Sequence, residues 1–97
     1  LESSTNLGFT GGNNLGLAYA LEHGYEYILL LNNDTEVAPD FLAPLVTALE
    51  TDSQAAAAGP LIYYHAAPQV VWSAGGVIDW RRGETHMPAM GRRDAGQ

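Results

Sequence analysis

The chain has 97 residues, which is enough for one domain and too few for two. It contains no cysteine, which excludes disulfides and thiolate metal sites, and it contains no lysine. Its net charge is −7, and residues 1–80 hold nine acids without a fixed cation, because all four arginines lie in the last seventeen residues. This balance excludes a nucleic-acid partner and leaves backbone amides or a bridging metal to meet a phosphate.

The first predicted elements are a loop and a helix. Residues 1–14 are rich in Ser, Thr, Asn and Gly, which indicates a loop. From Asn14 apolar residues recur at helical spacing, and His23 followed by Gly24 fits a helix end. The loop would offer exposed amides ahead of a helix N-terminus, which suits an anion, although glycine before a helix also fits a plain turn.

A strand and a second helix are predicted next. Tyr25–Leu31 is apolar without alternation, which is typical of a strand buried on both faces of a parallel sheet. Apolar residues at helical spacing then predict a helix over Phe41–Glu50, and we expect this helix to pack against that strand. The longest apolar run, Tyr27–Leu31, is far shorter than the roughly 20 residues that cross a bilayer.

The remaining residues predict short strands and a tail. Residues 55–64 indicate a strand broken at Gly59-Pro60, and residues 70–73 and 77–80 are two short strands that could pair as a hairpin. Residues 81–97 are polar and poorly periodic, so we expect a loop or tail there. The whole chain, 1–97, is therefore interpreted as a single partial domain with its sheet and helix core in residues 1–80.

Aromatic and imidazole side chains are given ordinary structural roles. We expect Trp72 and Trp80 to pack in the protein and not to stack on a sugar, although an aromatic face can do so. His23 is expected at a helix end, His65 in a loop and His86 in a solvated tail.

The turn at the end of the predicted buried strand is the candidate metal site. In open α/β sheets ligands bind beyond the carboxyl ends of strands. In extended backbone the Asn32 amide and the Asp34 carboxylate point the same way, so both could face one hard cation. The alternative is ordinary turn and helix-cap chemistry, which the pattern alone favours. Asn33-Asp34-Thr35 also spells an N-glycosylation sequon, which we interpret as an accident of the same turn.

Three motifs taken together resemble family 2 glycosyltransferases, especially rhamnosyltransferase-like members. They are Asn-Leu-Gly-Phe-Thr-Gly-Gly-Asn-Asn-Leu-Gly at residues 6–16, Leu-Leu-Leu-Asn-Asn-Asp-Thr at 29–35 and Pro-Asp-Phe-Leu at 39–42. The resemblance covers about residues 6 to 80. It implies an α/β fold, namely a partial GT-A Rossmann-like sheet with flanking helices, and inverting transfer from a nucleotide-diphosphate sugar with Mg²⁺ or Mn²⁺.

The resemblance also implies roles for individual residues. Asn32 matches the first position of the family's Asp-x-Asp motif and Asp34 the last, the usual metal ligand. Gly11 and Gly12 resemble the loop beneath the nucleotide, and Asn13 a position near the donor phosphates. Here the first position is an amide, Asn32, and not a carboxylate, which removes one negative charge. The metal would therefore depend more on Asp34, the diphosphate and water as ligands.

The resemblance implies that this chain is an internal fragment, because two parts that the family needs for activity would lie outside it. The strands that hold the nucleobase would precede Leu1, and the general base would lie beyond residue 97, so we expect the fragment to be inactive. The acceptor would be an unknown sugar or lipid-linked molecule. We expect a cytoplasmic protein, with the membrane surface as the alternative for the full-length protein, and a homo-oligomer that covers apolar surface left by truncation.

Two other functions compete with this interpretation. A non-catalytic nucleotide-sugar or protein binding module of the same fold is the alternative, and the sequence separates it poorly from an enzyme fragment. A nucleotidyltransferase is disfavoured because the usual Gly-rich start with a basic residue is absent from the sequence.

Overall fold

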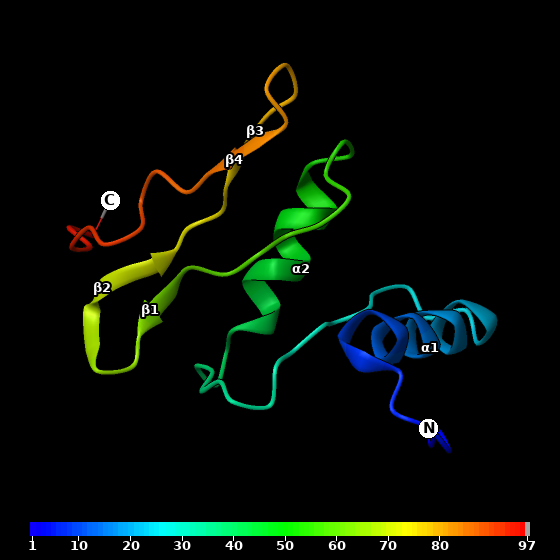
Figure 1. Ribbon diagram of the computed structural model, residues 1–97. Helices are drawn as coiled ribbons and strands as arrows, with labels where there is room; N and C mark the ends of the chain where they lie inside the picture. Colours follow the sequence, from blue (N-terminus) through cyan, green and yellow to red (C-terminus); the bar gives the residue numbers. More distant parts are fainter. Residues whose placement is uncertain (97) are drawn as a thin grey trace. The chain divides into compact units, whose positions relative to one another are not determined.

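The structure is a computed structural model that describes residues 1–96 (Figure 1). The chain divides into two compact units, Leu1–Val37 and the residues from Ala38 onward. The first unit contains one helix, and the second contains one helix and two antiparallel strand pairs. Helices and strands are thus both present, as predicted, but the described strands pair only antiparallel, so the Rossmann-like sheet stays a prediction.

Helix α1, Gly8–Glu22, begins earlier than the sequence predicts. The side-chain oxygen of Asn6 accepts a hydrogen bond from the Gly8 amide at 2.9 Å, so one of the amides that a helix start leaves without a partner is satisfied. The predicted loop over residues 1–14 is therefore wrong from Gly8 onward. The glycine-rich stretch that follows Asn6 forms the first turns of the helix and not a loop.

The end of α1 confirms the prediction. The Gly24 amide bonds to the Leu21 carbonyl at 3.2 Å and the Tyr25 amide to the Ala20 carbonyl at 3.2 Å. Gly24 has φ +70, a conformation that glycine adopts without a steric penalty. The His23 ring stacks on Tyr19 with centroids 3.9 Å apart, and its Nδ1 lies 2.8 Å from the Tyr19 carbonyl oxygen. This pattern is a Schellman C-cap reinforced by a histidine.

The prediction of a strand at Tyr25–Leu31 is wrong for this structure. Residues 27–32 have no regular secondary structure and no described strand includes them, and Leu30 is 59% exposed. A strand needs a neighbouring strand whose amides and carbonyls complete its hydrogen bonds. A parallel neighbour is joined to it through a crossover connection, usually a helix. The described residues include no neighbouring strand for it, so the segment belongs to no strand of this structure.

Helix α2, Leu42–Thr51, confirms the second helix within one residue at each end. Its Leu45, Val46 and Leu49 side chains are half-buried, while Leu42 is exposed. The Asp52 carboxylate accepts the Gln54 amide at 2.9 Å in the turn that follows. The predicted packing of this helix on residues 25–31 would join the two units and stays a prediction.

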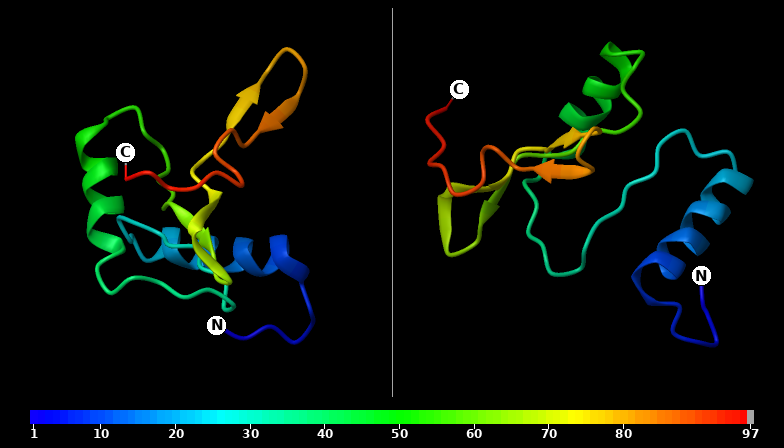
Figure 2. Two further views of the ribbon diagram at one scale, coloured as in Figure 1. Left: turned by 90° about the vertical axis from the view of Figure 1, so that its left-hand side faces the viewer. Right: turned by 45° about the horizontal axis from the view of Figure 1, so that its top comes forward.

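Strands β1, Ile62–Tyr64, and β2, Ala67–Ser73, form an antiparallel hairpin (Figures 1 and 2). Only the part of the predicted strand after Gly59-Pro60 is regular, because proline has no amide for a ladder. The far edge of β2 pairs with the chain end: the Val71 amide bonds to the Arg92 carbonyl at 2.9 Å, and the Asp94 amide bonds to the Gln69 carbonyl at 2.9 Å. Val71 is consequently 5% exposed, and among the described residues only it and Ala20 are buried.

Strands β3, Val77–Asp79, and β4, Glu84–His86, form a second hairpin. The predicted pairing of residues 70–73 with 77–80 is therefore wrong, because β2 has β1 on one edge and the chain end on the other. The predicted loop or tail over 81–97 is also wrong in part, since it contains β4 and the Val70–Arg93 bridge. No helix among the described residues is long and apolar enough to cross a bilayer.

Candidate functional site

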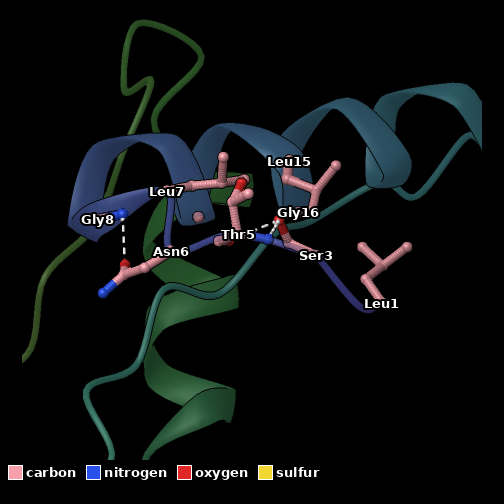
Figure 3. A pocket seen from close by; sticks show the side chains of 9 residues that line it. Leu1, Ser3, Thr5, Asn6, Leu7, Gly8, Leu15 and Gly16 are labelled. Carbon is pink, nitrogen blue, oxygen red and sulfur yellow. Dashed lines mark hydrogen bonds between the residues drawn. The ribbon is translucent and has the colours of Figure 1, made fainter.

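The start of α1 borders an open hollow of about 460 Å³ (Figure 3). Asn6 lies at its rim with its side-chain oxygen turned to the Gly8 amide, and Ser3 is held against Thr5 by hydrogen bonds of 2.8 and 3.4 Å. The residues that line the hollow are Leu1, Ser3, Thr5, Asn6, Leu7, Gly8, Gly12, Leu15 and Gly16. The hollow therefore combines the backbone of the helix start with short polar side chains and three leucines.

The structure places Gly11, Gly12 and Asn13 inside α1 and not in the predicted loop. Only the first four amides of a helix lack a partner within it, so the amides of Gly12 and Asn13 are engaged in the helix. Counted from the N-cap Leu7, those four amides belong to Leu7, Gly8, Phe9 and Thr10, so the Gly11 amide is engaged in the helix as well, and Phe9 and Thr10 keep free amides inside the first turn after Asn6 takes Gly8. The amide cradle expected from the sequence is thus displaced toward the helix start.

The three predicted site residues in α1 differ in how they contact the rest of the chain. A Cβ on Gly11 would come within 2.9 Å of the Leu7 Cβ, so close approach of the N-terminal segment requires glycine there. Gly12 has open space around it and lines the hollow, and Asn13 is half-buried. Gly12 is therefore the one of the three that borders the hollow directly.

The Asn32–Asp34 segment forms the turn that the sequence predicts. Asn33 and Asp34 are turn residues, and the Thr35 hydroxyl donates a hydrogen bond of 2.7 Å to the Asn32 carbonyl. Asn32 and Asp34 are both exposed, so the amide oxygen and the carboxylate are accessible to a ligand. This bond joins the Thr35 hydroxyl to the backbone of Asn32. It does not involve the side chain of either Asn32 or Asp34.

The donor set fits a cation that keeps water and phosphate ligands. Within residues 1–96 no group of three or more His, Cys, Asp or Glu side chains could enclose a metal ion. Mg²⁺ is usually held by one or two carboxylates together with substrate phosphates and waters. The Asp34 carboxylate and the Asn32 amide oxygen are hard donors of this kind, and both belong to one short turn.

Sequence reasoning missed a side-chain contact between Tyr63 and Asp94. The Tyr63 hydroxyl donates a hydrogen bond to the Asp94 carboxylate, which also accepts the Gly96 amide at 2.9 Å. The Tyr63 bond, with the Gly96 amide, lowers the pKa of Asp94, and the same bond to Asp94 raises the pKa of Tyr63. No local pattern marks this pair, because the two residues are 31 positions apart.

The structure also corrects two predictions about aromatic and imidazole groups. Trp80 does not pack, since it is 84% exposed, and Trp72 is 44% exposed. His86 belongs to β4 and not to a solvated tail, with its Nε2 3.7 Å from a Glu84 carboxylate oxygen. Trp80 and His86 both lie in the β3–β4 hairpin, which the sequence did not predict.

Comparison with known proteins identifies the family. The sequence profile of Glycosyl transferase family 2 matches residues 1–94, nearly the whole chain. The chain belongs to glycosyl transferase family 2. Both the α1 region and the Asn32–Asp34 turn lie within the matched range, so the candidate site falls in a glycosyltransferase domain.

Three curated relatives of this family 2 chain carry the description uncharacterized protein. The chain is 39% identical over 56 residues to uncharacterized proteins of Mycobacterium bovis and of two strains of Mycobacterium tuberculosis. The match covers 58% of this chain and 21% of each relative, so the chain spans about a fifth of their length. No solved structure matches the chain.

Proposed function

We propose that this chain is the part of an inverting glycosyltransferase domain that holds the diphosphate of a nucleotide-sugar donor. The observation that carries the proposal is the exposed Asn32-Asn33-Asp34 turn in a chain of family 2. We further propose the GT-A arrangement and the rhamnosyltransferase-like subgroup, on the joint spacing of the three motifs at 6–16, 29–35 and 39–42.

In this proposal Asp34 and Asn32 hold Mg²⁺ or Mn²⁺ and thereby orient the donor. When bound, the metal neutralises charge on the departing diphosphate. The need for it follows from the charges, because residues 1–80 contain nine acids and no lysine or arginine. The helix-start amides of α1 supply the remaining polar contacts to the donor, and Gly12 leaves open space for it beside the helix.

The proposed reaction divides between this chain and the rest of the domain. The acceptor hydroxyl attacks the anomeric carbon, the bond to the diphosphate breaks with its electrons leaving on the diphosphate, and an acidic residue beyond position 97 takes the hydroxyl proton. The acceptor is a sugar or lipid-linked molecule, and the proposed setting is the cytoplasm or the cytoplasmic membrane surface. The competing proposal is a binding module of the same fold that lacks turnover.

A release assay separates these proposals. The full-length protein that carries this chain is incubated with a panel of nucleotide sugars, and free nucleoside diphosphate is measured with Mn²⁺, Mg²⁺ or a chelator. We expect metal-dependent release that falls by roughly 100-fold in Asp34→Ala, the scale on which losing one charge-stabilising group is felt. Binding without release would favour the non-catalytic module, and equal release by Asp34→Ala and parent would exclude the assigned role.

A further inference from the structure

The tip of the β3–β4 hairpin presents the most exposed large apolar side chain of the described residues. Trp80 is 84% exposed, more than Phe9 at 77% and far more than Trp72 at 44%. It stands at the first position of the loop that joins β3 to β4, because β3 ends at Asp79 and β4 begins at Glu84. Exposing an indole to this extent is unfavourable in water, and an indole so displayed is a characteristic anchor for a ligand.

Asp79 holds the hairpin tip in one conformation. Its carboxylate accepts the amides of Arg81 at 2.9 Å and Arg82 at 3.2 Å, and its carbonyl accepts the Gly83 amide at 2.8 Å. Gly83 has φ +68, which completes the return into β4. The backbone on both sides of Trp80 is therefore fixed before any ligand arrives, which lowers the entropy lost on binding.

The charges around Trp80 cancel. Arg81 and Arg82 contribute two positive charges, and Asp79 and Glu84 contribute two negative ones. The Arg82 Nε lies 4.0 Å from an Asp79 carboxylate oxygen, so part of this charge is paired within the tip. A tip with no net charge, on a chain of net charge −7, does not attract a nucleic acid or an anionic membrane.

The ligand that matches an indole face with both donors and acceptors beside it is a neutral sugar. One face of a pyranose ring presents C–H groups that pack on an aromatic ring, while its hydroxyls donate to carboxylates and accept from guanidinium groups. We propose that Trp80 is a stacking platform for a neutral saccharide, with Arg81 and Arg82, the next two residues of the same turn, as hydrogen-bond donors. This inference rests on the proposed function, because a glycosyltransferase acting on a glycan acceptor supplies such a ring.

The chain's two tryptophans make the inference directly measurable. The indole N–H resonances of the ¹⁵N-labelled protein are assigned with Trp72→Phe and Trp80→Phe, because each variant removes one resonance of the parent spectrum. Neutral oligosaccharides of glucose, galactose, mannose and rhamnose are then titrated, with phosphatidylglycerol vesicles as a separate arm. We expect at least one saccharide to shift the Trp80 resonance, and Trp80→Ala to bind it roughly tenfold more weakly.

Two variants separate this inference from the proposed function. Asp34→Ala is expected to retain saccharide binding, and Trp80→Ala is expected to retain binding of Mn²⁺ with a nucleoside diphosphate. Failure of any saccharide to move the Trp80 resonance, unchanged affinity in Trp80→Ala, or a response to vesicles alone would each overturn the platform. None of these three outcomes bears on the nucleotide site.

Discussion

The hydroxyl of Tyr63 on β1 donates a hydrogen bond to the carboxylate of Asp94, which lies in the segment that pairs with the opposite edge of β2. The contact therefore spans the central strand and ties both of its neighbours together. A hydrogen bond to a charged acceptor is stronger than one between neutral groups. We infer that this pair fastens residues 91–94 to the sheet.

Removing the Tyr63 hydroxyl should loosen that segment. In Tyr63→Phe we expect faster hydrogen exchange at the Val71 and Asp94 amides, both of which bond across the β2 edge. Tyr64→Phe is the matched control, because it removes a hydroxyl from the next residue of the same strand. Equal exchange in the two variants would show that the Tyr63–Asp94 bond does not hold the segment.

The same pair predicts two pH limits for stability. Asp94 has a lowered pKa, so its contribution is present above the ordinary aspartate pKa of about 4 and is lost as pH falls through the lowered value. Tyr63 has a raised pKa, so its contribution is present below about 10 and is lost as pH rises through the raised value. The free energy of unfolding, measured with urea across both pH ranges, should fall at both ends in the parent. In Asp94→Asn the part of each fall that comes from this pair should be absent. Superimposable profiles would contradict the linkage.

Val71 is the buried side chain at the centre of β2, so its truncation should be costly. We expect Val71→Ala to lower the free energy of unfolding by roughly 1.5 to 3 kcal/mol. Val77→Ala, which truncates a valine that is 59% exposed on β3, should change it by less than about 0.5 kcal/mol. Thermal or urea unfolding measures both, and a loss in Val77→Ala as large as that in Val71→Ala would show that Val71 is not a core residue.

Local signals in the sequence predicted the helices better than the strand pairing. The Gly24 cap and the apolar spacing of α2 are encoded within a few residues, and the structure confirms both. Strand pairing depends on which segments meet, and no short pattern states that β2 pairs with residues 91–94 instead of with β3. The exposure of Trp80 could not be predicted for the same reason, since it follows from a hairpin whose second strand, Glu84–His86, has no apolar residue to mark it.

The candidate site divides in the same way. The Asn32–Asp34 turn was predicted from its residue types, and the Thr35 contact in the structure is the turn chemistry that those types favour. The positions of Gly11, Gly12 and Asn13 were misjudged, because the glycine-rich residues that predict a loop lie within α1, which begins at Gly8. The metal-binding role of Asn32 and Asp34 stays a prediction.

The exposed apolar segment at residues 28–31 predicts self-association. Ile28, Leu29, Leu30 and Leu31 are 40%, 48%, 59% and 54% exposed, a continuous apolar stretch without strand pairing among the described residues. Such a stretch is a favourable site for association between chains. Light scattering should show a dimer or larger assembly that Leu30→Asn weakens. A monomer that persists at high protein concentration would contradict the expectation of a homo-oligomer.

Adding a carboxylate at position 32, the first position of the motif, tests the proposed metal site by a gain of affinity instead of a loss. Asn32→Asp replaces an amide oxygen with a carboxylate, and cation affinity rises with the charge of the ligands. We expect tighter binding of Mn²⁺ in the presence of a nucleoside diphosphate, measured by titration calorimetry. Asn33→Asp adds the same charge one position away and should give a smaller gain. A gain from Asn33→Asp as large as that from Asn32→Asp would indicate a general charge effect and not a ligand.

Calorimetry of Mn²⁺ with nucleoside diphosphates, compared between parent and Asp34→Ala, tests the central claim most directly. Asp40→Ala serves as the control, because it removes a carboxylate of equal charge outside the turn. The proposed site predicts a clear loss of Mn²⁺-dependent nucleotide affinity in Asp34→Ala and parent-like affinity in Asp40→Ala. Equal affinity in all three proteins would contradict the assignment of Asp34 as the residue that holds the metal and, through it, the donor diphosphate.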